Sequence, residues 1–128
     1  MVLVDTSIWI DYFKGKESAL LLNDLIDSNN VCINNLILSE LIPSIEHRGE
    51  HELKELLYSV TKLPLNIDWN TIIQMQIKNI KNGINTVGIP DLLILQNALD
   101  HNVKLFSSDK HFDLMSSIHN FELYAKVG

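Results

Sequence analysis

Short apolar runs alternate along the chain with longer segments whose apolar residues recur at helical spacing. The runs at residues 2–4, 31–33 and 103–106 are rich in Val, Ile, Leu and Phe. Such runs predict strands that are buried on both faces. Two weaker runs, at 63–65 and 121–123, predict a short strand and an edge strand.

Helical patterns fill the intervals between these strands. Asp68 is a favourable N-cap and Gly83 a favourable stop for one of the helices. Strands that alternate with helices predict an α/β fold with a central parallel sheet flanked by helices on both faces. One helix is predicted to begin after Asp5, one near residue 36 and one after 107–109. Four more are predicted at 18–27, 50–60, 69–82 and 91–100.

The size and composition of the chain fit one globular domain. It has 128 residues, of which 46% are hydrophobic and 20% charged, enough to bury a full core. Its single cysteine, Cys32, excludes a disulfide framework and favours a reducing, cytoplasmic compartment. No stretch approaches the ~18 uncharged apolar residues of a membrane span, so no membrane association is expected.

The charge balance argues against nucleic-acid binding through basic side chains alone. Ten Lys and Arg residues stand against sixteen Asp and Glu residues, for a formal net charge of −6. Proteins that bind nucleic acid by neutralising phosphates are usually basic. Either the chain does not bind nucleic acid, or bound divalent cations supply the missing positive charge.

Two aspartates follow predicted strands. Asp5 comes directly after 2–4, and Asp109 lies just beyond 103–106. In open parallel sheets, sites form outside the carboxyl ends of the strands, so both side chains are expected in one crevice. Each is also suited to capping the helix that follows, and for Asp109 taken alone capping is the preferred interpretation.

Two further acids lie in apolar helical segments. Glu40 belongs to 36–42 (LILSELI), where a carboxylate is costly to bury without a partner or a metal; a place at the solvent edge of the helix is the alternative. Asp91 follows Pro90 at the predicted start of a buried helix, where an acid also suits the helix dipole.

Convergence of these four carboxylates would create strong repulsion, which hard cations relieve. Mg²⁺ and Mn²⁺ prefer oxygen ligands and commonly bridge carboxylates to phosphates. The pattern therefore predicts metal-assisted phosphoryl transfer, in which the metal activates water and stabilises the leaving oxygen.

The acidic residues lie in four segments whose order is specific, although each segment alone is a weak signal. The first two are residues 4–10 (VDTSIWI) and 38–41 (LSEL), and the last two are 88–94 (GIPDLLI) and 105–112 (LFSSDKHF). Together they resemble the motifs of PIN-domain proteins of the VapC toxin type. The resemblance covers essentially the whole chain, so 1–128 is identified as a single PIN domain.

The resemblance implies a PIN-like three-layer α/β/α fold and a Mg²⁺- or Mn²⁺-dependent endoribonuclease. Its substrates would be structured RNAs such as tRNA or rRNA, whose phosphodiester bonds are hydrolysed. Such proteins are usually homodimers and act as toxins that a cognate antitoxin neutralises. The toxin–antitoxin complex often represses its own operator, so contact with DNA is expected only through that complex.

The same resemblance assigns roles to individual acids. Asp5, Glu40, Asp91 and Asp109 match the catalytic residues that bind the metal. Asp113, one helical turn beyond Asp109, is a weaker candidate for the fourth ligand and is expected to be a solvated charge.

Other residues receive supporting roles. Thr6 and Ser107 match hydroxyl residues that lie beside the metal or its ligands, and Lys110 is the best candidate for a phosphate contact. Trp9 could stack on a base, but core packing is the preferred interpretation. The remaining candidates for phosphate contacts, more simply interpreted as solvated surface charges, are Lys14, Lys16, Arg48 and Lys62.

Three alternatives fit parts of the sequence. Metal-free RNA cleavage would use a histidine acid–base pair, and of the five histidines only His47 and His51 fall one helical turn apart. A receiver domain requires an acidic pair at the first strand, whereas Asp5 stands between Val4 and Thr6. The third alternative keeps the PIN fold but binds a partner without cleaving RNA.

Overall fold

Four short parallel strands form the centre of the molecule. The computed structural model describes residues 1–125, so the last residues of the expected domain, 126–128, lie outside the described part. The strands are β1 (Val2–Val4), β2 (Val31–Ile33), β3 (Thr61–Lys62) and β4 (Lys104–Phe106). They lie in the sheet in the order β3-β2-β1-β4, and all neighbouring pairs are parallel.

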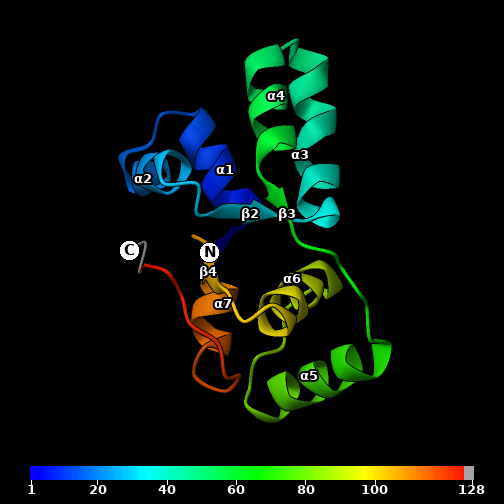
Figure 1. Cartoon of the computed structure of the whole chain (residues 1–128). Helices are drawn as coiled ribbons and strands as arrows, with labels where there is room; N and C mark the ends of the chain where they lie inside the picture. The colour runs from blue at the N-terminus through cyan, green and yellow to red at the C-terminus, as the bar shows by residue number, and fades with distance from the viewer. Residues whose placement is uncertain (126–128) are drawn as a thin grey trace.

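Helices connect the strands and cover the sheet on both sides. They are α1 (Thr6–Phe13), the 3₁₀ turn η1 (Glu17–Ala19), α2 (Leu21–Asp27), α3 (Asn35–Arg48), α4 (His51–Ser59), α5 (Trp69–Lys81), α6 (Ile89–Asp100) and α7 (Lys110–Met115). Figure 1 shows α1 and α2 to the left of the sheet and α6 to its right. The predicted three-layer α/β/α fold with a parallel sheet is therefore confirmed.

Two of the weaker strand predictions need correction. The strand expected at 63–65 lies instead at 61–62, as β3. Leu63 still donates its N–H to the Ile33 carbonyl at 2.8 Å, but Pro64 has no N–H to continue the ladder. The edge strand expected at 121–123 is reduced to a single parallel bridge between Leu105 and Leu123.

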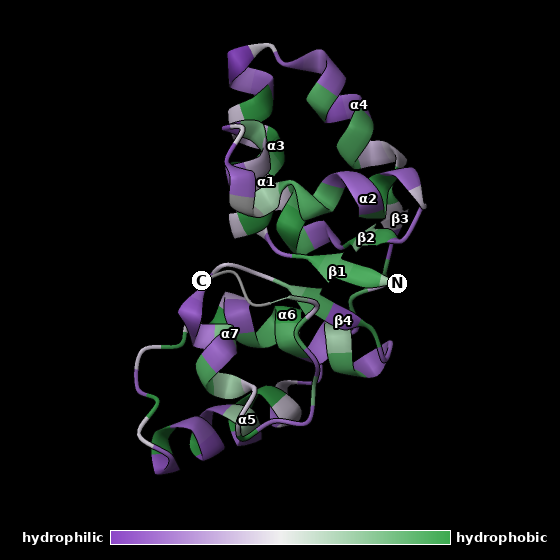
Figure 2. Ribbon diagram, turned by 90° about the vertical axis from the view of Figure 1, so that its left-hand side faces the viewer, coloured by the Kyte–Doolittle hydropathy of each residue, from purple (hydrophilic) through white to green (hydrophobic). Residues whose placement is uncertain are grey.

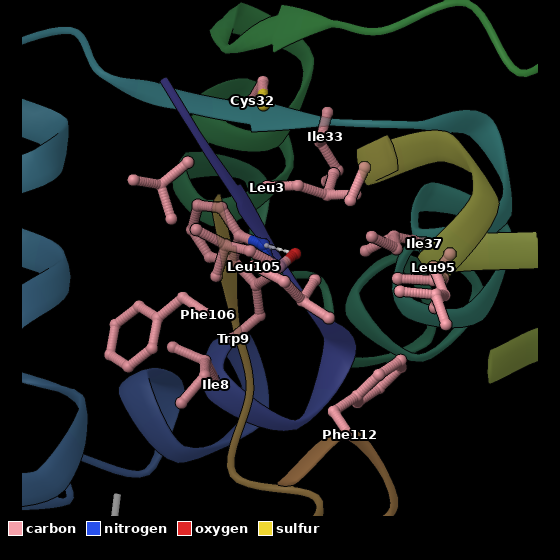
Figure 3. Packing of buried hydrophobic residues seen from close by; sticks show 14 of the residues in the cluster. Leu3, Ile8, Trp9, Cys32, Ile33, Ile37, Leu95, Leu105, Phe106 and Phe112 are labelled. Atoms are coloured by element: carbon pink, nitrogen blue, oxygen red, sulfur yellow. Dashed lines mark hydrogen bonds between the residues drawn. The ribbon is translucent and has the colours of Figure 1, made fainter. Parts of the chain in front are cut away.

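The core lies between the sheet and the helices that follow its strands. Trp9, Phe106 and Phe112 are fully buried. Figure 3 shows the Trp9 indole among these residues, with its N–H directed at a backbone oxygen; the acceptor is the Val4 carbonyl, at 3.2 Å. Trp9 is therefore a core residue, as preferred from the sequence. Within residues 1–125, none of the helices has the length and apolar character needed to cross a bilayer.

Candidate active site

Asp5 lies at the carboxyl end of β1 with its side chain turned into the molecule. It occupies the N-cap position of α1, yet its carboxylate does not cap that helix. Instead, Oδ2 accepts hydrogen bonds from Ser107 Oγ at 2.8 Å and Ser7 Oγ at 3.0 Å. Ser107 follows β4 and is 102 residues away along the chain. The adjacency of β1 and β4 therefore brings these groups together, as expected for a crevice at the strand ends.

Glu40 reaches the same region from α3. Thr6 Oγ1 donates a hydrogen bond to Glu40 Oε1 at 3.2 Å. The position of α3 depends on a buried amide pair: Asn34 caps the helix by accepting from Ile37 N at 2.9 Å, and its Nδ2 donates to Asn97 Oδ1 on α6 at 2.9 Å. The helix that carries Glu40 is thus tied directly to α6, the helix that carries Asp91.

Asp91 and Asp109 meet at an imidazole. His111 Nδ1 lies 3.3 Å from Asp91 Oδ2 and 3.4 Å from Asp109 Oδ1, and one donor atom from each of the three residues fits within 4.8 Å of the others. His111 Nε2 is 3.1 Å from Thr86 Oγ1. Since Nδ1 faces two carboxylates, we assign the proton to it, so that Nε2 accepts from the Thr86 hydroxyl.

The carboxyl groups of this site disfavour one another's ionisation. Burial is the main factor that raises the pKa of Asp5, of Glu40 and of Asp91. Negative charge adds to this: Asp109 raises the pKa of Asp5 and of Asp91, while Asp5 and Asp91 raise the pKa of Glu40. Hydrogen bonds from Ser107, Thr6 and His111 oppose the increase only in part.

The donor set fits a hard divalent cation. Within residues 1–125, no lysine or arginine forms an ion pair with any of the four carboxylates. The residues present are mainly oxygen donors, the ligand type that Mg²⁺ and Mn²⁺ prefer. A bound cation would supply the counter-charge that the side chains do not provide.

The other charged candidates from the sequence are exposed. Lys110 is exposed at the start of α7, and no hydrogen bond or ion pair involves its ammonium within the described part of the chain. Asp113 is exposed on the same helix, in agreement with a solvated charge. His47 and His51, the pair of the metal-free alternative, are exposed at the turn between α3 and α4.

Sequence reasoning missed three residues that shape this site. His111 lies within the fourth acidic motif, and its spacing of two residues from Asp109 was the available signal. Asn34 and Asn97 lie just after a predicted strand and within a predicted apolar helix, where neither shows a site signal. Their pairing across 63 residues leaves no local trace in the sequence.

The chain belongs to the PIN-domain family, whose profile matches residues 2–117. No curated protein matches the sequence significantly. Among solved structures, the chain is similar to one described as VapBC2 from Rickettsia felis bound to a DNA fragment from its promoter, with 20% identity and a TM-score of 0.74. That match covers 96% of this chain and 97% of the other.

Two further toxin–antitoxin structures have the same fold. The DNA-bound VapBC from Salmonella typhimurium is 17% identical with a TM-score of 0.74, over 99% of this chain and 98% of the other. VapBC-1 from nontypeable Haemophilus influenzae is 19% identical with a TM-score of 0.70, again over 99% of this chain and 98% of the other. At these identities the similarity establishes the fold.

Proposed function

We propose that the chain, as a single PIN domain, is a Mg²⁺- or Mn²⁺-dependent endoribonuclease that hydrolyses phosphodiester bonds in structured RNA such as tRNA or rRNA. The observation that supports this proposal is that four carboxylates from four segments lie near enough for their charges to raise the pKa of Asp5, Glu40 and Asp91. Within residues 1–125, no lysine or arginine forms an ion pair with them. Membership of the PIN family and the similarity to VapBC structures support it.

In this proposal Asp5, Glu40, Asp91 and Asp109 hold the cation. When bound, the ion activates water and stabilises the negative charge that develops on the leaving oxygen. The cleaved RNA would carry a 5′-phosphate and a 3′-hydroxyl.

The hydroxyl and imidazole groups keep the carboxylates in place before substrate arrives. Ser107 and Ser7 fix one oxygen of Asp5, and Thr6 fixes one oxygen of Glu40. His111 holds Asp91 and Asp109 together. Such outer groups orient ligands, and their loss typically lowers metal affinity or activity. Lys110, exposed beside this site, would contact an RNA phosphate as a point charge.

We also propose that the protein is the toxin of a toxin–antitoxin pair and acts in the cytoplasm. The similar structures described above contain VapBC complexes, two of them bound to DNA. By this analogy a cognate antitoxin would neutralise the chain, and operator DNA would be bound only through the complex. A homodimer is the third expected assembly.

Purified full-length protein tests the nuclease directly. Wild type, Asp5→Asn and the matched control Asp113→Asn are incubated with total RNA and Mg²⁺ or Mn²⁺, with and without a chelator, and the new RNA ends are sequenced. We expect wild type and Asp113→Asn to produce 5′-phosphate ends that chelator and Asp5→Asn both abolish.

Other outcomes favour the alternatives. Cleavage that survives the chelator and leaves cyclic phosphates would support a histidine mechanism. Binding of RNA without cleavage by the metal-loaded wild type would support a binding protein with a PIN fold.

A further inference from the structure

One donor beside the carboxylates of the candidate site is a nitrogen. His111 Nδ1 faces Asp91 Oδ2 and Asp109 Oδ1, and one donor atom from each residue lies within 4.8 Å of the others. The side chains of Asp91, His111 and Asp109 are 23%, 26% and 35% exposed. An ion therefore reaches all three from solvent, and part of its coordination shell stays open to water or substrate.

The spacing of these donors suits ligands that share an ion better than a closed ion pair. Nδ1 lies 3.3 Å from Asp91 and 3.4 Å from Asp109, whereas a charged N–H···O bond is about 2.7–2.9 Å long. The imidazole thus closes on neither carboxylate. Two donors that bind one ion at about 2.1 Å lie about 3.4 Å apart at a tetrahedral angle and about 3.0 Å apart at an octahedral one.

The imidazole is also held from its other side. The backbone N–H of His111 donates to Asp109 Oδ1 at 2.9 Å, so the start of α7 sets this carboxylate beside the ring. Nε2 lies 3.1 Å from Thr86 Oγ1. Because a hydroxyl both donates and accepts, Thr86 also suits the tautomer in which Nε2 carries the proton and Nδ1 offers its lone pair to an ion. Metal-binding histidines usually have the second ring nitrogen fixed in this way.

Two neighbouring helices present the three donors. Asp91 lies in the first turn of α6 and His111 in the first turn of α7, and Figures 1 and 2 both show these helices next to each other. Phe112 follows His111 and is fully buried, which anchors the start of α7 in the core. The nitrogen is therefore held on a helix rather than on a loop, and sites built on helices are the more precise ones.

We propose that His111 Nδ1 binds the cation of the candidate site directly, together with Asp91 and Asp109, and makes the site select divalent transition ions such as Mn²⁺ over Mg²⁺. Imidazole is a good ligand for transition ions, whereas Mg²⁺ is held mainly by oxygen. The proposal rests on the proposed function, because the same carboxylates serve both. It changes the role of His111 from orienting the ligands to being one of them.

Binding of the metal alone, without RNA, tests the selectivity. Full-length wild type, His111→Gln, His111→Asp and the control His47→Gln, which replaces an exposed histidine of α3, are titrated with Mn²⁺ and with Mg²⁺ by calorimetry. We expect wild type and the control to bind Mn²⁺ about 10-fold or more tightly than Mg²⁺.

The two substitutions of His111 separate binding from orientation. His111→Gln keeps an N–H that can hold the carboxylates but lacks the ring nitrogen, so Mn²⁺ binding should weaken by about 100-fold or more, beyond the effect usual for an orienting group. His111→Asp supplies an oxygen ligand instead, and we expect it to bring the affinities for Mg²⁺ and Mn²⁺ to within a few-fold of each other.

Pulsed electron paramagnetic resonance of the Mn²⁺-loaded protein identifies the ligand directly, because a coordinated nitrogen modulates the electron spin echo. We expect this nitrogen signal in wild type and His47→Gln, and its loss in His111→Gln and His111→Asp. Thr86→Val should keep the signal but weaken Mn²⁺ binding about 10-fold, since Thr86 only orients the ring.

The outcomes separate this proposal from the proposed function. Mn²⁺ that binds wild type without a nitrogen signal, or equally tightly to wild type and His111→Gln, would overturn the role of His111 and leave an all-oxygen metal site in place. Failure of both ions to bind wild type would overturn the metal site itself. Circular dichroism melts show which variants remain folded, and if His111→Gln unfolds, His111→Asp decides.

Discussion

The acidic crevice and the outer face of α5 both depart from what stability alone favours, but in opposite ways. The crevice buries Asp5 and half-buries Asp91, whereas Glu40 stays exposed at the solvent edge of α3. Desolvation is the main factor that raises the pKa of each of the three. The α5 face leaves four large apolar side chains in water, those of Trp69, Ile73, Ile77 and Ile80. Both regions lack a partner within residues 1–125: the crevice needs positive charge, and the α5 face needs apolar surface.

The two regions differ in how much the lack of a partner lowers the stability of the folded chain. A carboxylate that is desolvated beside other carboxylates destabilises the native state relative to the unfolded one, in which it is hydrated. An exposed isoleucine is hydrated in both states, so its exposure costs the fold little. The crevice is therefore maintained against a folding penalty, which is typical of functional sites.

The largest expected effect is on catalysis, in Asp91→Asn. We expect RNA cleavage to fall about 10³-fold, equivalent to about 4 kcal/mol, more than the 10–100-fold typical of a group that only orients a ligand. In metal-free buffer the same change should raise the free energy of unfolding, because the amide is neutral and does not repel Asp109. Asp113→Asn, on the exposed face of α7, is the control in which neither quantity moves.

A fall in activity together with a rise in the free energy of unfolding distinguishes a functional carboxylate from a structural one. If Asp91→Asn lowers the stability of the metal-free protein together with its activity, Asp91 is needed for the fold, and the comparison between the two regions fails.

The second effect compares two neighbouring residues on opposite faces of α5. Ile72→Ala should lower the free energy of unfolding by about 3 kcal/mol, because Ile72 is 2% exposed and its loss leaves a cavity. Ile73→Ala should change it by about 0.5 kcal/mol or less at concentrations where the chain is monomeric. Urea denaturation at two protein concentrations measures both. If both variants lose the same free energy of unfolding at low protein concentration, the α5 face is covered within the monomer.

A smaller effect is expected from cation binding. Mn²⁺ at 100 times its dissociation constant should stabilise the wild type by about 2.7 kcal/mol through mass action, seen as a rise in melting temperature. Asp5→Asn should reduce that rise, whereas Ile73→Glu/Ile77→Glu should retain it, since the α5 face holds no ligand. If the rise in melting temperature is lost equally in both variants, the ion does not bind at the crevice.

The smallest effect concerns pH and the inner face of α5. His119 donates from Nε2 to Asn79 Oδ1 at 2.8 Å, and burial lowers the pKa of its imidazole below 6.5. Because the unfolded chain then binds the proton more readily, the free energy of unfolding should fall as pH drops below 6.5. His119→Gln keeps a donor for Asn79 and should remove this dependence.

Asp5, Glu40 and Asp91 contribute with the opposite sign, which separates the two contributions. Because the pKa of each is raised in the folded state, the metal-free protein loses stability as pH rises from their unfolded-state pKa of about 4 through the higher folded-state values. A fall in stability below pH 6.5 that persists unchanged in His119→Gln would assign the titration to another group.

Much of the fold could be predicted because its signals are local. The apolar run 2–4 and the helical period of 69–82 depend on neighbouring residues, and the structure places a strand and a helix there within a residue. The strand expected at 63–65 failed for an equally local reason, the missing N–H of Pro64. The edge strand expected at 121–123 is reduced to one bridge, because Leu105 is the one residue of β4 that pairs with it.

The candidate site was predictable only as a set of residues. Asp109 illustrates this, because its Oδ1 caps α7 by accepting from His111 N at 2.9 Å and also faces the His111 ring. Capping and a place in the crevice were therefore not alternatives. Asp5 shows the reverse case: it occupies an N-cap position, yet its side chain bonds to Ser107 rather than to the helix.

The sequence by itself determined the three longer strands and the helices, and that four acids lie at their ends or within an apolar helix, because these properties depend on the period of apolar residues and on short-range capping. Only the tertiary structure decided that Ser107 reaches Asp5, that Asn34 joins Asn97, and that one imidazole holds two carboxylates. Those contacts depend on strand order and helix packing, which bring together residues that are far apart in the chain and carry no sign of each other in the local sequence.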